Sequence, residues 1–131
     1  DVYKRQGYGL SYTTFAYSDI HLSSTEMSAD GELTATVTVT NTGSRDGAEV
    51  VQLYIRDLVG SVTRPVKELK GFEKIFLKAG ESRKVSFSIT PELLKFYNYD
   101  LQFVCEPGDF DVMIGGNSRD VKKARFLLKG E

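Results

Sequence analysis

The chain contains 131 residues, of which 40% are hydrophobic and 27% charged, and its formal net charge at pH 7 is −1. This length suffices for one domain with a hydrophobic core but not for two. The balanced charge excludes the basic footprint of a nucleic-acid-binding protein and the polybasic patch of a protein that binds membrane surfaces. No apolar stretch approaches the ~20 residues that a membrane helix needs.

The first predicted strand lies in "TTFAYSDIHLS" (13–23). Phe15 and Tyr17 share one phase of the two-residue period, whereas Ile20 and Leu22 share the other. One extra residue in a strand reverses the phase of everything after it. The pattern therefore predicts a bulge or kink near Ser18.

The next two strands show the alternation most clearly. In "ELTATVTVTNTG" (32–43), apolar residues alternate with threonines, which predicts a half-buried strand. "AEVVQLYIRD" (48–57) follows as another strand. Its predicted inward side chains are Val51, Leu53 and Ile55. Its outward face carries Val50 and Tyr54, and is thus more apolar than contact with water alone would select.

The middle of the chain shows weaker patterns. "LVGSVTRPVKELKG" (58–71) is predicted to be an irregular connection, because Pro65 cannot donate a hydrogen bond to a central ladder. "FEKIFL" (72–77) is a predicted strand with poor alternation, and "SRKVSFSIT" (82–90) restores the two-residue period. Thr90 fits a helix N-cap and Pro91 the first helical position, so one helical turn is expected next.

The last third is predicted to contain an antiparallel pair and a closing strand. "LQFVCE" (101–106) leads into "DFDVMIGG" (109–116) through a type II turn with Pro107 and Gly108 at its centre. "VKKARFLL" (121–128) closes the fold. Seven or eight short strands without a long helix predict an all-β fold, an antiparallel sandwich of immunoglobulin or fibronectin III type.

The residues that could carry catalysis form no recognisable constellation. Cys105 is the only cysteine and His21 the only histidine, and nothing in the sequence places them together as a nucleophile and base. His21 also lacks a second metal ligand at a usual spacing. Asp109 and Asp111 are interpreted as acids that cover an exposed face, in preference to an acid/base pair. We therefore predict no catalytic residue, no metal site and no cofactor.

A carbohydrate-binding module is the alternative function for a sandwich of this kind. Such modules stack sugar rings on exposed aromatic side chains, and Tyr54, Tyr97 and Tyr99 could form a platform. The chain has no tryptophan, which is the usual platform residue. Aromatic residues in a sandwich more often belong to the core or to an interface, so sugar binding is the less favoured function.

Four separated blocks carry a resemblance to a known family. They are "GYGLSYTTF", "VTVTNTGSRDGAEVVQLYIRD", "RPVKELKGFEKIFLKAGES" and "EPGDFDVMIGGNS". Together they resemble the C-terminal fibronectin type III-like domain of glycoside hydrolase family 3 enzymes, which are β-glucosidases and β-xylosidases. The likeness runs from Gly7 to Leu128, with the blocks in the order and spacing of the family.

The resemblance implies a division of the chain. In the family, a segment similar to "GYGLSYTTF" follows Pro-Phe and carries the chain from the catalytic body into this domain, whereas "KRQ" precedes it here. We therefore expect residues 1–6 to be a non-native remnant of a tag or of gene assembly, and residues 7–12 a linker from an absent catalytic domain. The sandwich is expected to span residues 13–131. The catalytic Asp and Glu of the family lie in other domains, so no catalytic residue carries over.

The resemblance also implies a role and a partner. The expected role is that of a non-catalytic accessory domain, which packs on and stabilises the absent catalytic domains of a β-glucosidase-like enzyme. Residues 58–71, with Arg64, Pro65 and Lys67, are expected near the substrate entrance. A domain separated from its partner should expose apolar residues, and self-association of the isolated chain through them is expected. The predicted interface residues are Tyr8, Leu10, Tyr12, Val50, Tyr54, Phe76, Tyr97 and Leu127.

Overall fold

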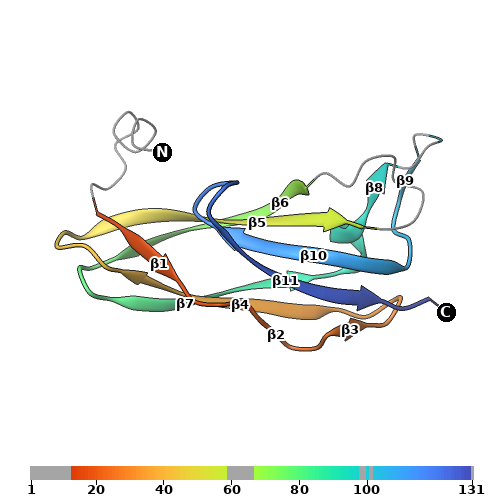
Figure 1. Ribbon diagram of the computed structural model, residues 1–131, viewed down its shortest axis with the longest axis horizontal. Coiled ribbons are helices and arrows are strands. Elements are labelled where there is room, and N and C mark those ends of the chain that lie inside the picture. The colour runs from red at the N-terminus through yellow and green to blue at the C-terminus, as the bar shows by residue number, and fades with distance from the viewer. Residues whose placement is uncertain (1–12, 59–66, 98–99, 101, 131) are drawn as a thin grey trace.

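Two β-sheets pack face to face in the computed structural model, which describes residues 13–58, 67–97, 100 and 102–130 (Figure 1). In the four-stranded sheet, β4 (Leu33–Asn41) pairs on one side with β1 (Phe15–Tyr17) and β2 (His21–Leu22), and on the other with β7 (Ser82–Ile89). The five-stranded sheet has the order β3 (Glu26–Met27), β11 (Val121–Leu128), β10 (Gly108–Gly115), β5 (Gly47–Asp57), β6 (Lys67–Leu77). Among the strands of the described residues, only β3 and β11 pair in parallel. The prediction of an all-β sandwich is confirmed.

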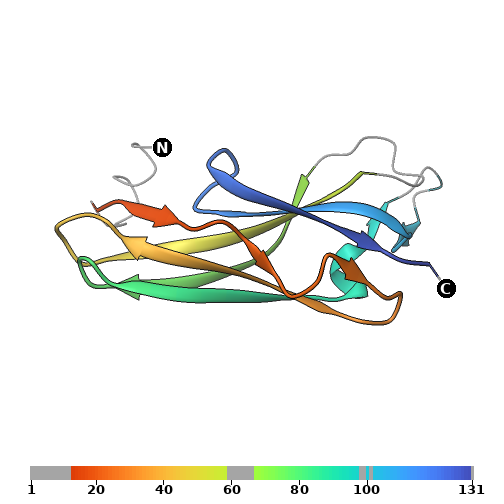
Figure 2. The same cartoon turned by 60° about the horizontal axis from the view of Figure 1, so that its bottom comes forward.

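A small ribbon stands at one end of the sandwich. The 3₁₀ turn η1 (Pro91–Leu94) follows β7 and leads into β8 (Phe96–Tyr97), which pairs with β9 (Phe103–Val104). Figure 2 shows the turn and β8 at the same end of the molecule. Thr90 occupies the N-cap and Pro91 the start of the turn, as predicted, although the Thr90 side chain makes no capping hydrogen bond.

The inward faces of the strands form one continuous core. Alternate residues of β4 and most alternate residues of β5 are buried, as is every residue of β10 from Phe110 to Gly115. The rings of Phe110 and Phe126 stack with their centroids 5.5 Å apart. Burying apolar side chains on this scale is the main term that stabilises a domain of this size. The apolar residues buried in the phase of the two-residue pattern are Leu33, Ala35, Val37, Val39, Val51, Leu53, Ile55, Val85, Ile89, Phe110, Val112, Ile114, Phe126 and Leu128. Phe87 and Ala124 share this phase but are half-buried.

The predicted irregularity near Ser18 is confirmed as a bulge. Tyr17 pairs with Val39 and His21 with Thr36, so three residues of the first strand oppose two of β4. Ser18 holds the bulge, because its backbone N–H donates to the Thr38 carbonyl at 2.9 Å and its Oγ accepts from the Thr38 N–H at 2.8 Å. The bulge allows the side chains on both sides of it to pack against the core.

The connection predicted over 58–71 is too long, because β6 begins at Lys67. A second bulge explains the error. Leu53 pairs with Gly71 and Tyr54 with Leu69, so Lys70 is an extra residue in β6. The extra residue disrupts the two-residue period that would identify the strand in the sequence. Residues 59–66, which include Arg64 and Pro65, lie outside the described part of the chain.

The hairpin predicted at Pro107 and Gly108 is wrong. β9 pairs with β8, whereas β10 pairs with β11 and β5. Gly108 does have a positive φ, but its value of 141° differs from the roughly 80° of a type II turn. β10 lies between two strands of the five-stranded sheet, so a third partner has no place beside it.

A buried hydrogen-bond network anchors the chain where it enters the sandwich. Asn41 is completely buried, and its Oδ1 accepts hydrogen bonds from Thr13 Oγ1 at 2.7 Å and from the Gly43 N–H at 3.0 Å. Its Nδ2 donates to the carbonyls of Arg45 at 2.8 Å and Leu77 at 3.0 Å. A Cβ on Gly43 would lie 1.8 Å from Thr13 Oγ1, so only glycine fits there. One side chain thus joins the first described residue to the ends of β4 and β6.

Asn41→Ala should lower the free energy of unfolding by about 3 kcal/mol, because it leaves several buried polar groups without partners. Urea denaturation followed by circular dichroism measures this loss. Asn117→Ala is the matched control, since Asn117 Oδ1 also accepts from two backbone N–H groups but in an exposed turn. A loss no larger than that of the control would contradict a buried anchor.

Candidate interaction surface

The outer face of the four-stranded sheet is polar. Its side chains alternate with the buried ones on β4 and β7, and cross-strand pairs of hydroxyl groups bond to each other, Thr36 to Ser86 at 2.9 Å and Thr40 to Ser82 at 2.7 Å. These pairs satisfy their own hydrogen bonds and offer little apolar area. The residues on this face are Ala16, His21, Thr34, Thr36, Thr38, Thr40, Ser82, Lys84, Ser86 and Ser88. This face is therefore stable when it is exposed to solvent.

The outer face of the five-stranded sheet is different. On its last strand, β6, the outward side chains Leu69, Phe72 and Phe76 are 52%, 68% and 54% exposed. Phe76 is paired with Ala48 of β5, and Lys74, between the two phenylalanines, with Val50. We call Leu69, Phe72 and Phe76 the β6 apolar row. Exposed apolar residues grouped on one strand mark interaction sites more often than scattered ones do.

The predicted interface residues fall in several places. Phe76 belongs to the β6 apolar row and Val50 lies half-buried beside it. Tyr97 is 59% exposed on the β8–β9 ribbon, and Leu127 is 37% exposed on β11, near the opposite edge of the sheet. Tyr8, Leu10 and Tyr12 lie outside the described residues.

Tyr54, also predicted at the interface, is engaged within the domain. Its hydroxyl donates to Gln52 Oε1, and Gln52 Nε2 donates to the Gly116 carbonyl at 3.2 Å. Lys67 Nζ lies 5.6 Å from the centre of the Tyr54 ring and donates to the Ser118 carbonyl. Leu69, Phe72 and Phe103 are exposed apolar residues that the sequence prediction missed. The bulge at Lys70 reverses the phase of β6, and this irregular alternation was the only signal for Leu69 and Phe72.

Lys70 fastens the β8–β9 ribbon to β6. Its Nζ donates to the Lys95 carbonyl at 2.8 Å and lies 3.3 Å from Glu68 Oε1. The same ammonium group lies 4.4 Å from the ring centre of Phe96 and 5.4 Å from that of Phe103. Cation–π contacts gain strength when the cation is withdrawn from water, and only 12% of this side chain is exposed. The bulged residue of β6 thus holds both strands of the ribbon.

A charged triplet crosses the middle of the five-stranded sheet. Asp111 of β10 is paired with Arg56 of β5 on one side and with Arg125 of β11 on the other. Arg125 Nε donates to Asp111 Oδ1 at 3.0 Å, and this hydrogen bond raises the pKa of Arg125. Asp111 is buried, so its predicted place on an exposed face is wrong. The ion pair with Arg125 offsets part of the cost of burying this carboxylate, whose Oδ2 has no hydrogen-bond partner among the described residues.

Tyr17 connects the two sheets at one edge of the sandwich. Its hydroxyl donates to Glu49 Oε2 of β5 at 3.0 Å. Burial, followed by the charge of Glu49 and this hydrogen bond, raises the pKa of Tyr17 far above its ordinary value of 10.0. An open hollow beside Tyr17 is lined by residues of β1, of the turn between β10 and β11, and of the start of β11, among them Arg119 and Lys122.

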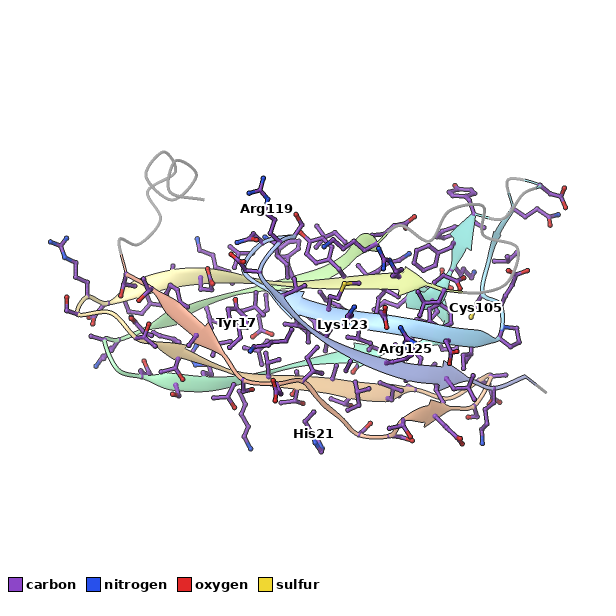
Figure 3. All side chains as sticks on the ribbon, in the orientation of Figure 1. Tyr17, His21, Cys105, Arg119, Lys123 and Arg125 are labelled. Carbon is purple, nitrogen blue, oxygen red and sulfur yellow. The ribbon has the colours of Figure 1, made fainter. Side chains whose placement is uncertain are left out.

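The residues with catalytic side chains are dispersed. Figure 3 shows His21 on β2 and Cys105 beyond β9, far apart on the molecule. Burial is the largest cause of the raised pKa of the Cys105 thiol, which opposes formation of a reactive thiolate. Among the described residues, no group of three or more His, Cys, Asp or Glu is arranged to hold a metal ion. In the same part of the chain, no helix has the length and apolar character needed to span a membrane.

Comparison with known proteins assigns this fold to a family. The fibronectin type III-like domain family matches residues 49–118, just over half of the chain. The periplasmic β-glucosidase of Salmonella typhimurium is 57% identical over 122 residues, which are 93% of this chain and 16% of the enzyme. A β-xylosidase of Formosa agariphila is 46% identical over 125 residues, covering 94% of this chain and 17% of the enzyme.

A solved structure gives the same result. The chain superimposes on a glycoside hydrolase family 3 β-glucosidase of Bifidobacterium adolescentis with a TM-score of 0.78 and 38% identity, covering 93% of this chain and 18% of that one. The chain belongs to the fibronectin type III-like domain family. It matches the non-catalytic domain of this kind that family 3 glycoside hydrolases contain, and it spans about one sixth of the length of the curated relatives it matches.

Tyr17→Phe should reduce the decrease in the free energy of unfolding that occurs at high pH. Above about pH 10 the unfolded chain ionises this tyrosine while the folded chain keeps it neutral, so the free energy of unfolding falls as the pH rises. In the variant that fall should be smaller by about 1 kcal/mol at about pH 11. Urea denaturation of both proteins at a series of pH values measures it, and parallel curves would show that Tyr17 is not protected.

Lys70→Met should loosen the β8–β9 ribbon. The loss of the Lys95 hydrogen bond and of both ring contacts should cost about 1–3 kcal/mol. Cys105, two residues after Phe103, should then react faster with a disulfide reagent at neutral pH. Lys74→Met is the matched control, because Lys74 lies on the same strand but is exposed. Equal rates in both variants would exclude a fastening role for Lys70.

Proposed function

We propose that the chain is the non-catalytic accessory domain of a family 3 glycoside hydrolase of the β-glucosidase or β-xylosidase type, and that it packs on and stabilises the catalytic domains. One observation carries the proposal. The sandwich has a complete core of its own, yet it exposes the β6 apolar row. These side chains gain nothing from water and become stabilising only when another surface covers them.

The size relationship supports the same role. The relatives are about six times as long as the match, and they are a β-glucosidase and a β-xylosidase by name. The matched part of each relative is a fibronectin type III-like sandwich. The remainder of such an enzyme would supply both the activity and the covering surface.

A carbohydrate-binding module is less well supported. Tyr54 lies under Lys67 and donates to Gln52, whereas Tyr97 lies on the ribbon with its ring centre 4.9 Å from that of Phe103. The two tyrosines belong to different elements and serve different contacts. Tyr99, the third predicted platform residue, lies outside the described residues.

We also propose that the connection after β5 lies on the substrate side of the enzyme. Arg64 and Pro65 of this connection lie outside the described residues. The ammonium group of Lys67 already contacts Ser118 and the Tyr54 ring. The proposal therefore assigns no substrate contact to Lys67.

A chimera tests the accessory role. The matching segment of the Salmonella periplasmic β-glucosidase is replaced by this chain, and the product is compared with the same enzyme lacking the segment. We expect the chimera to be soluble and to hydrolyse an aryl β-glucoside, and the truncated enzyme to lose activity quickly on warming, because a bound domain stabilises the state that it binds. A chimera no more stable than the truncated enzyme would contradict the proposal.

Two controls use the isolated chain. It should give no turnover of an aryl β-glucoside or β-xyloside above buffer, since the catalytic groups belong to other domains. It should also give no heat with gluco- or xylo-oligosaccharides in titration calorimetry. Saturable heat would favour the carbohydrate-binding function instead.

A further inference from the structure

Resting on the proposed function, we infer which surface the catalytic part of the polypeptide covers. The docking surface is the β6 edge of the five-stranded sheet, continued by the exposed rings of the β8–β9 ribbon. Its residues are Leu69, Phe72, Phe76, Tyr97 and Phe103. The occupant is the catalytic part of the proposed parent enzyme, which is joined to this domain on the N-terminal side of Thr13 and presents an apolar surface.

The outer faces of the two sheets differ in polarity, and this difference identifies the five-stranded sheet as the docking face. The four-stranded sheet turns paired threonine and serine hydroxyls outward. Covering that face would remove polar groups from water and gain little apolar burial. The five-stranded sheet offers Phe72, the most exposed of the large apolar side chains described, with Leu69 and Phe76 on the same strand.

The position of β6 makes the row accessible from two directions. β6 is the last strand of its sheet, so one side of its backbone has no strand partner in the part of the chain that the structure describes. An apolar edge strand without cover promotes unwanted pairing between molecules, and natural proteins usually protect such an edge. A partner that covers β6 buries the apolar row and shields this edge at the same time.

Lys70 makes the ribbon part of the same surface. Its side chain joins the middle of β6 to Lys95, Phe96 and Phe103. Leu69 directly precedes Lys70, and the rings of Tyr97 and Phe103 pack together on the ribbon. The exposed apolar side chains thus follow one edge of the sandwich, from the end of β6 to the ribbon.

The entry of the chain identifies the occupant. Thr13, the first described residue, is linked through Asn41 to the Leu77 carbonyl by two hydrogen bonds. Leu77 follows Phe76 directly, so the preceding polypeptide joins the sandwich beside one end of the β6 apolar row. A partner attached at that point reaches the row at high effective concentration. Lys74 is exposed between Phe72 and Phe76, so we expect the facing surface to carry an acidic group that pairs with its positive charge.

The test places Phe72→Ser together with Phe76→Ser in the chimera described above. We expect the melting temperature of the chimera to fall by several degrees and its activity to decay faster on warming. The same pair in the isolated chain should change its own melting temperature little, because both rings are largely exposed there. Leu127→Ser is the matched control, an exposed apolar residue three strands away in the same sheet.

Hydrogen exchange supplies an independent readout. The amides of β6 and of the ribbon should exchange more slowly in the chimera than in the isolated chain, whereas those of β7 should not change. A stable, active chimera that is insensitive to the β6 pair and shows no such protection would overturn the docking surface and leave the accessory role intact. A chimera no better than the truncated enzyme would overturn both.

A second copy of the chain is the competing occupant. If the isolated chain is a dimer that the β6 pair converts to monomer, and the chimera is insensitive to the same pair, the β6 edge serves self-association and our inference is wrong. A dimer of the isolated chain that disappears in the chimera supports the inference, because both partners then compete for one surface. Size-exclusion chromatography with light scattering distinguishes these results.

Discussion

The hydrophobic core between the two sheets is the constraint on which the rest of the structure depends. Its side chains come from alternate positions of β4, β5 and β10, and those of Val39, Leu53 and Ile114 are wholly buried. Successive side chains of a strand point to opposite faces, so this core also determines which residues meet water. Wherever the chain must change phase, it inserts an extra residue. The bulges at Ser18 and Lys70 are such places.

The strict alternation of Thr and apolar residues made β4 predictable from the sequence, including its buried face. The phase change between Tyr17 and Ile20 likewise predicted the first bulge. The start of β6 was missed because Lys70 breaks the two-residue period. The burial of Asp111 was missed because β5, which covers one side of β10, lies far from it in the chain. Asn41 looked like the end of a strand, and its four hydrogen-bond partners become neighbours only after folding.

The candidate interaction surface was predictable only in part. Phe76 and Tyr97 were chosen as apolar residues on strand faces that should be wet, and both are more than half exposed. Tyr54 was chosen on the same ground, but it lies against Lys67 and Gln52, which a strand pattern does not reveal. Leu69 and Phe72 required knowledge of the second bulge. Tertiary pairing, not side-chain type, thus decides which outward aromatic residues remain available to a partner.

The exposed edge at β6 has a consequence for how such a protein is made. In the arrangement we propose, the covering surface precedes this domain in the polypeptide, so it leaves the ribosome and folds first. β6 then forms beside a surface that is already in place. Its phenylalanines and unpaired backbone meet solvent only briefly during synthesis. The order of the domains along the chain would act as an internal chaperone for the strand most prone to aggregation.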